Sequence, residues 1–199
     1  MRGPLVWAAV ATASLATAMP LGAEVKDQAA NGFTVENTQL VPVAPDVAWR
    51  GLIDVGRWWP ADHRWWGRAA NLTIDPVAGG CFCEVDGARQ ARHMQVVFVE
   101  PGKLLRMTGG LGPLQGMGWD GVLEFRLAAE GQGTRITLWY RAGGYAPDDL
   151  TALAAVVDRV QAGQLLGLAE YLGPGAAPAP KAQKLMNRPP LTGTLAPVR

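Results

Sequence analysis

The sequence predicts an α+β protein in which one curved antiparallel sheet of about seven strands wraps around a long C-terminal helix. Short segments of alternating polar and apolar residues recur between Asp-Gly and Gly-x-Gly turns, a pattern typical of an antiparallel meander. A single amphipathic segment of about 24 residues follows them and would extend ~36 Å as a helix, enough to cross a whole sheet. A helix packed on such a sheet buries the apolar sides of both.

The first predicted elements are a strand and two short helices. Residues 33–43 alternate and contain many β-branched side chains, which predicts the strand. Pro-Asp at 45–46 begins a helix that ends at Gly56, since proline is favoured at the first helical position and an acidic residue in the first turn. A second short helix is expected from Pro60 to Gly67.

Six further strands follow at short, regular spacing. The segment VLEFRL places Leu123, Phe125 and Leu127 on one side and two charged residues on the other, so we expect one buried and one solvated face. The predicted strands span residues 71–75, 80–85, 92–100, 103–109, 119–130 and 134–144.

The long helix is predicted to begin at Asp148 and Asp149, which would cap it, and to end before Gly173. Apolar residues recur along it at spacings of three and four, which marks the side that faces the sheet. They are Leu150, Leu153, Val157, Val160, Leu168 and Tyr171, with Leu165 and Leu172 widening the stripe.

Four motifs occur in an order shared with a known superfamily. They are the paired tryptophans after the first helix, DPVAGGCFCEV (75–85), VFVEPGKLLRMTG (97–109) and GTRITLWYRAGG (133–144). Over residues 33–172 the chain resembles the START-like (SRPBCC) superfamily of polyketide cyclases, lipid-transfer proteins and Bet v-type allergens, and especially its branch related to activators of a heat-shock chaperone's ATPase. The resemblance implies a helix-grip fold with a hollow for an apolar ligand between the sheet and the long helix.

The segment RWWPADHRWWG (57–67) contains four of the chain's eight tryptophans. Four indoles in so short a segment are unusual for a core, because each buried indole N–H needs a partner. We expect them to surround the mouth of the hollow, with core packing as the alternative for any one of them. The predicted ligand contacts are Trp58, Trp59, Trp65, Trp66, Cys83, Met94, Phe98, Met107, Trp119, Phe125, Tyr140, Leu165 and Leu168.

Three polar residues are candidates for catalysis: Asp62, His63 and Glu84. The first two lie between the tryptophan pairs, where they could orient a carbonyl or hydroxyl or simply be solvated. A hairpin turn at 87–88 makes Glu84 a diagonal neighbour of His93, which is a plausible acid–base couple. We expect this couple on the solvent side of the sheet, where an ordinary surface pair is the default.

The two cysteines, Cys81 and Cys83, are interpreted as small core residues on one face of a strand. Residues two apart in a strand have Cα atoms about 6.6 Å apart, at the upper edge of disulfide geometry. Export would nevertheless permit oxidation. In the same register both cysteines face inward with Met94 while His93 faces outward, so we expect no metal site.

Charge and motifs argue against nucleic acids and nucleotides as ligands. The net charge is +1 and no basic stripe is present, so no nucleic-acid partner is expected. The glycine-rich segment 109–118 lacks the ending of a P-loop and opens no helix, which indicates a long turn or a mobile flap beside the hollow. We therefore expect no cofactor.

The N-terminus is typical of an export signal. Arg2 precedes an uncharged run of about 15 residues, shorter than the roughly 20 of a membrane span, with cleavage sites after Ala18 or Ala23. We expect a signal peptide over 1–23, although an uncleaved anchor is the alternative.

The remaining chain would be a START-like domain over 24–173 and a disordered Pro/Ala-rich tail over 174–199. The mature protein would be periplasmic or secreted and would have no stable membrane span.

Three functions remain open from the sequence. The favoured one is an exported domain that binds a small hydrophobic or aromatic molecule. The second is a cyclase- or hydratase-type enzyme that uses the same hollow. The third is a protein-binding adaptor like the chaperone activators.

Overall fold

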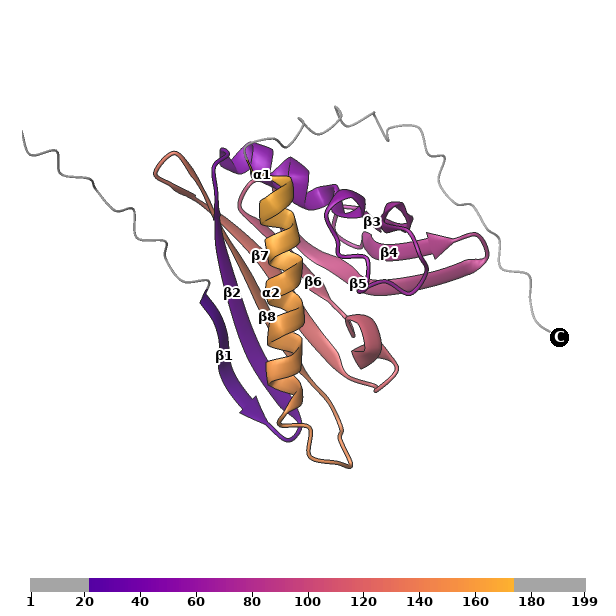
Figure 1. Cartoon of the computed structure of the whole chain (residues 1–199). Coiled ribbons are helices and arrows are strands. Elements are labelled where there is room, and N and C mark those ends of the chain that lie inside the picture. Colours follow the sequence, from indigo (N-terminus) through magenta and orange to yellow (C-terminus); the bar gives the residue numbers. More distant parts are fainter. Residues whose placement is uncertain (1–21, 174–199) are drawn as a thin grey trace, which may run out of the picture.

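The computed structural model describes residues 22–173 and has the predicted α+β architecture (Figure 1). An eight-stranded antiparallel sheet curves around helix α2, with the strand order β1-β2-β8-β7-β6-β5-β4-β3. The strands are β1 (Gly22–Ala29), β2 (Gly32–Val41), β3 (Leu72–Ile74), β4 (Cys81–Asp86), β5 (Arg89–Glu100), β6 (Leu104–Thr108), β7 (Asp120–Glu130) and β8 (Gly133–Gly143). The helices are α1 (Pro45–Ile53), α2 (Leu153–Tyr171) and the 3₁₀ turns η1 (Val55–Arg57), η2 (Ala69–Asn71) and η3 (Gly112–Gln115).

Strand β1 adds an eighth strand to the roughly seven predicted. It pairs antiparallel with β2, from Gly22 opposite Thr38 to Ala29 opposite Gly32. Its residues were assigned to the end of the signal peptide and to a charged segment, so no strand was expected there. Charged side chains suit this exposed edge because they discourage pairing with another chain. The other residues of the predicted signal peptide, 1–21, and the predicted tail, 174–199, lie outside the described residues.

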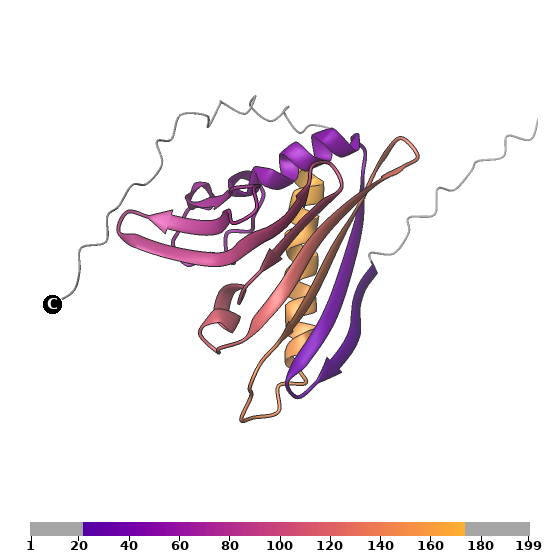
Figure 2. The ribbon, with the colours of Figure 1, turned by 180° about the vertical axis from the view of Figure 1, so that it is seen from behind.

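Helix α2 lies across one face of the sheet and covers only part of it. Figures 1 and 2 show it over the β1–β2–β8 end, in front of the sheet in one view and behind it in the other. Its contacts are mainly with β2 and β1. The β5–β3 end of the sheet therefore needs other cover, which the segment between α1 and β3 provides. No helix within residues 22–173 is long and apolar enough to span a membrane.

The predicted helix at residues 60–67 is absent, and the predicted start of the long helix was wrong. Residues 60–68 form turns and bends instead of a second short helix, because their backbone groups bond to side chains. Helix α2 begins at Leu153, and neither Asp148 nor Asp149 caps it. The Asp149 carboxylate instead accepts hydrogen bonds from the backbone and hydroxyl of Thr151 in a preceding turn.

A β-bulge in the β4–β5 hairpin shifts the predicted register of β5 from Met94 onward. The expected register holds from Asp86 opposite Arg89 to Cys83 opposite Arg92, and then Phe82 lies opposite Met94. His93 is the extra residue, so His93 and Met94 are both buried in succession. The prediction that Glu84 and His93 share a face is confirmed, but this face is the inner one. The expectation that they form a surface pair was wrong.

The interpretation of the cysteines was also wrong. Cys81 and Cys83 are half-buried and joined by a disulfide, with their Cα atoms 5.4 Å apart. Their neighbours Phe82 and Glu84 take the buried positions of β4. The alternation along the strand therefore places the two sulfur atoms away from the inner face.

One buried hydrogen bond ties α2 to the sheet. Asn37 Nδ2 on β2 donates to Asp158 Oδ1 on α2 over 3.0 Å, and both side chains are buried. We expect Asn37→Ala to lower the free energy of unfolding by about 1–3 kcal/mol, because it leaves a buried carboxylate oxygen without its donor. Urea unfolding measures this change. The double variant Asn37→Ala/Asp158→Ala should lose less free energy of unfolding than the sum of the losses in the two single variants. If the two losses add in full, the side chains do not interact.

Candidate functional site

A cavity of about 300 Å³ lies between α2, the 59–65 segment, η3 and the sheet. Its helix wall is mainly apolar and includes Leu153, Val157 and Val160. These residues belong to the stripe that was predicted to pack on the sheet. Much of that stripe borders the cavity instead, while Leu165 and Leu168 occupy the core.

The segment 59–65 forms a second wall, although it has no regular secondary structure. Trp59 is buried and its indole Nε1 donates to the His63 carbonyl over 2.7 Å. Arg64 Nε donates to the Ala61 carbonyl over 3.2 Å, so the segment is braced by its own side chains. Trp65 is 48% exposed and lines the cavity, which suits a position at its edge.

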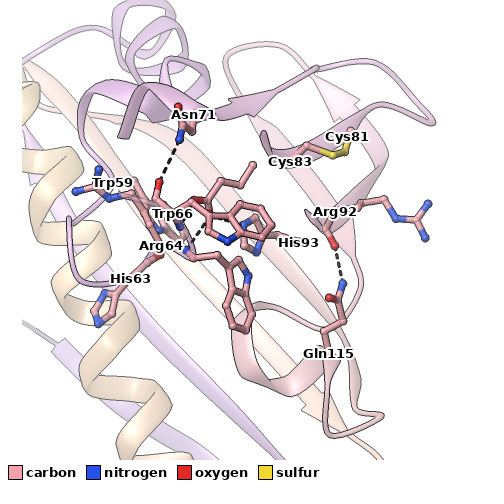
Figure 3. Close-up of polar contacts among 12 residues, drawn as sticks. Trp59, His63, Arg64, Trp66, Asn71, Cys81, Cys83, Arg92, His93 and Gln115 are labelled. Carbon is pink, nitrogen blue, oxygen red and sulfur yellow. Dashed lines mark hydrogen bonds and ion pairs between the residues drawn. A yellow bond between two sulfur atoms is a disulfide. The ribbon is translucent and has the colours of Figure 1, made fainter. Parts of the chain in front are cut away.

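The buried carboxylate of Glu84 attaches this segment to the sheet. Its side chain is 0% exposed and accepts the Trp65 backbone N–H over 3.0 Å and the Trp66 backbone N–H over 2.7 Å. Figure 3 shows the surrounding contacts, including Asn71, which donates to the Trp66 carbonyl over 3.1 Å. In a helix the backbone N–H groups would bond to carbonyls of the same segment. Here side chains from outside it, Glu84 and Asn71, bond to its backbone and hold the irregular segment in place.

The same carboxylate contacts His93. Glu84 Oε2 lies 3.3 Å from His93 Nε2, and the His93 side chain is only 6% exposed. Burial lowers the pKa of His93 below its ordinary value of 6.5, and the hydrogen bond and charge of Glu84 offset this only in part. The imidazole is therefore neutral at pH 7. The tautomer that donates Nε2–H to Glu84 carries its lone pair on Nδ1.

The glycine-rich segment supplies a third wall. Leu111, Leu114 and Met117 line the cavity, and Leu114 is buried. Gln115 Nε2 donates to the Arg92 carbonyl over 2.7 Å and so connects η3 to β5, as Figure 3 shows. The segment predicted as a long turn or flap therefore contributes apolar side chains to the site.

Four residues that line the cavity each have a buried polar atom without a hydrogen-bond partner. The atoms are His63 Nδ1, the Tyr140 hydroxyl, Gln161 Oε1 and Gln164 Oε1. Burial raises the pKa of Tyr140 well above its ordinary value of 10.0, and the opposing effect of the nearby Leu111 backbone N–H is smaller. The hydroxyl is therefore protonated at every ordinary pH. Buried polar groups are nearly always paired, so the four atoms are suited to a bound molecule or water.

The predicted site residues fall into two groups. Trp59, Asp62, His63, Trp65 and Tyr140 line the cavity. The other predicted ligand contacts do not line it. Trp58, Met94, Met107, Trp119, Phe125, Leu165 and Leu168 are buried in the core, and Cys83 is in the disulfide.

Trp66 and Phe98 also lie away from the cavity. Trp66 is half-buried and stacks against the Arg89 guanidinium, 5.5 Å from the ring centroid. A second bulge, at Val97, turns Phe98 to the outer face, where it is 42% exposed and lies under Arg106. Strict alternation along β5 could not reveal this reversal.

Sequence analysis missed several residues that line the cavity. Gln161 lies four residues after Val157, and Gln164 three residues after Gln161, so the helical period places both on the face of Val157. Both are polar, whereas the ligand contacts predicted on this helix were its apolar residues Leu165 and Leu168. His93 was recognised but assigned to the solvent. Leu111, Leu114 and Met117 are apolar residues within the glycine-rich segment, and their presence could have indicated that this segment lines the cavity.

Within residues 22–173, no cluster of three histidine, cysteine or acidic side chains could hold a metal ion. Cys81 and Cys83 bond to each other on the side of β4 away from His93, so the three do not converge. Figure 3 shows the disulfide apart from the loop that carries Trp59 and His63.

A curved sheet that grips one long helix around a small apolar cavity defines a helix-grip domain. The family described as polyketide cyclase/dehydrase and lipid transport matches residues 32–173. The chain belongs to this family, which confirms the resemblance to the START-like superfamily. No curated protein matches the chain by sequence.

Several solved structures share the fold. Mll3558 from Rhizobium loti is 20% identical with a TM-score of 0.52, and the match covers 71% of this chain and 97% of that one. The Aha1 dimer from Colwellia psychrerythraea is 15% identical with a TM-score of 0.51, covering 72% and 98%. DynU16, from the dynemicin biosynthetic locus, is 20% identical with a TM-score of 0.52, covering 73% and 49%. At these identities the likeness establishes the fold alone.

We expect Glu84→Gln to loosen the 59–65 wall. The amide has one carbonyl oxygen where the carboxylate has two, so one backbone N–H loses its acceptor and the free energy of unfolding falls by about 1–3 kcal/mol. Hydrogen exchange at the Trp65 and Trp66 amides should accelerate, and this is the measurement that reports on the wall itself.

Glu124→Gln is the matched control for this change. Glu124 is also a buried carboxylate held by hydrogen bonds: burial would raise its pKa, but the bonds from Arg106 and Arg126 lower it below the ordinary 4.5. Its substitution should leave exchange at Trp65 and Trp66 unaltered. Equal protection of these amides in wild type and Glu84→Gln would contradict the role assigned to Glu84.

Proposed function

We propose that this protein binds a small, mainly apolar ring compound that carries at least one hydroxyl, carbonyl or amide group. The observation that carries the proposal is the cavity, whose mainly apolar walls contain four unpaired polar atoms. Binding sites for small molecules combine such walls with a few polar groups that fix orientation. Family membership supports the same class of ligand.

The volume favours a compact ligand over a long-chain lipid. About 300 Å³ is at the lower end of the range for small-molecule sites, roughly 300–1,000 Å³. Burying apolar surface would supply the affinity, at about 25 cal/mol per Å². The amide oxygens of Gln161 and Gln164 could accept hydrogen bonds from the ligand, while the Tyr140 hydroxyl could donate one.

Tryptophan fluorescence tests the proposal, with 2-naphthol as a compact probe and palmitate as a long-chain one. Trp59 and Trp65 line the cavity, so bound 2-naphthol should quench the protein's emission. Val160→Phe fills part of the cavity and should weaken 2-naphthol binding by at least about tenfold, or ~1.4 kcal/mol. Palmitate should bind more weakly than 2-naphthol.

Leu166→Phe is the matched control, because Leu166 lies on the exposed side of the same helix. It should leave 2-naphthol affinity unchanged. Equal weakening by the two substitutions, or emission that no compact aromatic probe alters, would refute the cavity as the binding site.

We also propose that the protein is exported and works in the periplasm or outside the cell. The N-terminal sequence supports this, as does the Cys81–Cys83 disulfide, since disulfides persist in oxidising compartments. Cleavage after Ala18 would leave β1 whole, whereas cleavage after Ala23 would remove the two residues that pair with Thr38 and Asn37. Mass spectrometry of the N-terminal peptide from fractionated cells should find the chain beginning after Ala18; an unprocessed chain in the cytosol alone would contradict export.

A further inference from the structure

We propose that His93 is a general base that moves a proton on a carbonyl compound bound in the cavity, with Glu84 as its positioning residue. The inference rests on the proposed function, because the reacting molecule would occupy the same cavity. It goes further by assigning a reaction to a site that would otherwise only bind.

The backbone of β5 is arranged to present His93 to the cavity. Without the bulge, period-two alternation would allow only one of His93 and Met94 to face inward. The bulge turns both inward, so Met94 fills the core while His93 borders the cavity. Bulges commonly re-aim a side chain in this way next to active sites.

Glu84 fixes the orientation of the imidazole. Its carboxylate lies 3.3 Å from His93 Nε2 and is itself held by the two backbone amides of the 65–66 segment. A carboxylate on one ring nitrogen sets the tautomer and leaves the other nitrogen as the acceptor. It also stabilises the imidazolium that forms when the ring takes a proton, as an orienting carboxylate does in other acid–base sites.

The chain's other histidine, His63, also lines the cavity but has no buried carboxylate to hold its ring. Its Nδ1 is 4.0 Å from Asp62 Oδ1, which is beyond hydrogen-bond distance, and the Asp62 side chain is 80% exposed. His63 Nδ1 is buried without a partner. His93 is therefore the histidine whose ring is held in one orientation by a buried carboxylate.

Tyr140 supplies a donor for the carbonyl oxygen. Tyr140 lines the same cavity, and its hydroxyl is buried, protonated and without a hydrogen-bond partner. A hydrogen bond from this hydroxyl strengthens as negative charge develops on the ligand oxygen, which stabilises an enolate.

The step balances without an oxidant or a second reactant. The Nδ1 lone pair of His93 takes a proton from the carbon next to the carbonyl, and that C–H bond breaks. Its electrons form a carbon–carbon double bond, and the carbonyl π electrons move to the oxygen, which accepts the hydrogen bond from Tyr140. The proton then returns from Nδ1 to carbon, so the step is an enolisation that can exchange or relocate a hydrogen atom.

The protonation states suit this step near neutral pH. The lowered pKa keeps His93 in the neutral form that can accept a proton. The titratable and charged groups around the cavity are Asp62, His63, Arg64, Glu84 and Tyr140. The rate should rise with pH through the pKa of His93 and then level off, because the base is active only when deprotonated.

The test uses 2-tetralone, a compact bicyclic ketone, with the full mature protein. Tryptophan quenching measures its binding, and proton NMR in D₂O measures exchange of the hydrogens beside its carbonyl. We expect wild type to accelerate exchange above the buffer rate, and His93→Asn to lose at least ~100-fold of that acceleration while binding 2-tetralone equally well. Millimolar imidazole should restore exchange to His93→Ala, which a structural role could not explain.

The outcomes separate the two proposals. Binding of 2-tetralone without accelerated exchange would overturn the inference and leave the proposed function standing. Absence of binding by both 2-tetralone and 2-naphthol would overturn both. Exchange that survives His93→Asn but is lost in His63→Asn would overturn the assignment to His93.

The positioning role of Glu84 has its own readout. In Glu84→Gln the imidazole loses its charged neighbour, so the midpoint of the pH–rate profile should shift to lower pH and the maximal rate should fall. Glu124→Gln, on the outer face of the sheet, should leave the profile unchanged. An identical profile in wild type and Glu84→Gln would overturn this role.

Discussion

The candidate site depends on one buried carboxylate. Glu84 belongs to β4, yet it accepts hydrogen bonds from the backbone of the 65–66 segment and contacts His93 on β5. A carboxylate is costly to bury unless such donors surround it. The contacts that satisfy Glu84 are therefore also those that give an irregular segment a fixed shape. That segment covers the end of the sheet that α2 leaves uncovered, and its residues 59 and 62–65 line the cavity.

Helix α2 contributes both to stability and to the cavity. Leu165 and Leu168 pack in the core and Asp158 bonds to Asn37 on β2, so these residues anchor the helix to the sheet. Val157 and Gln161 lie on the same side of the helix, nearer its N-terminus than Leu165 and Leu168, and line the cavity. Because residues three and four apart share one side of a helix, this side can pack in the core along one part of its length and line a cavity along another.

The sequence predicted the fold more completely than the site. Period-two alternation and turn residues located seven strands. Strand β1 was missed because its sequence was interpreted as the end of a signal peptide followed by a charged segment. For the site, Trp59, Trp65 and Tyr140 were placed at the cavity, whereas Trp58 and Phe125 lie in the core. Residue type alone could not separate these groups, since an indole or phenyl ring is equally suited to a core and to a cavity wall.

The sequence by itself determined the order of the elements, the register of the β4–β5 hairpin as far as Cys83 and Arg92, and the shared face of Glu84 and His93. Local periodicity and turn chemistry decide these properties within a few residues. Only the tertiary structure decided which face is the inner one and where the bulges occur. A single extra residue reverses every following side chain, and its place depends on contacts with segments distant in the sequence. The same holds for the 59–65 segment, whose shape comes from a carboxylate on another strand.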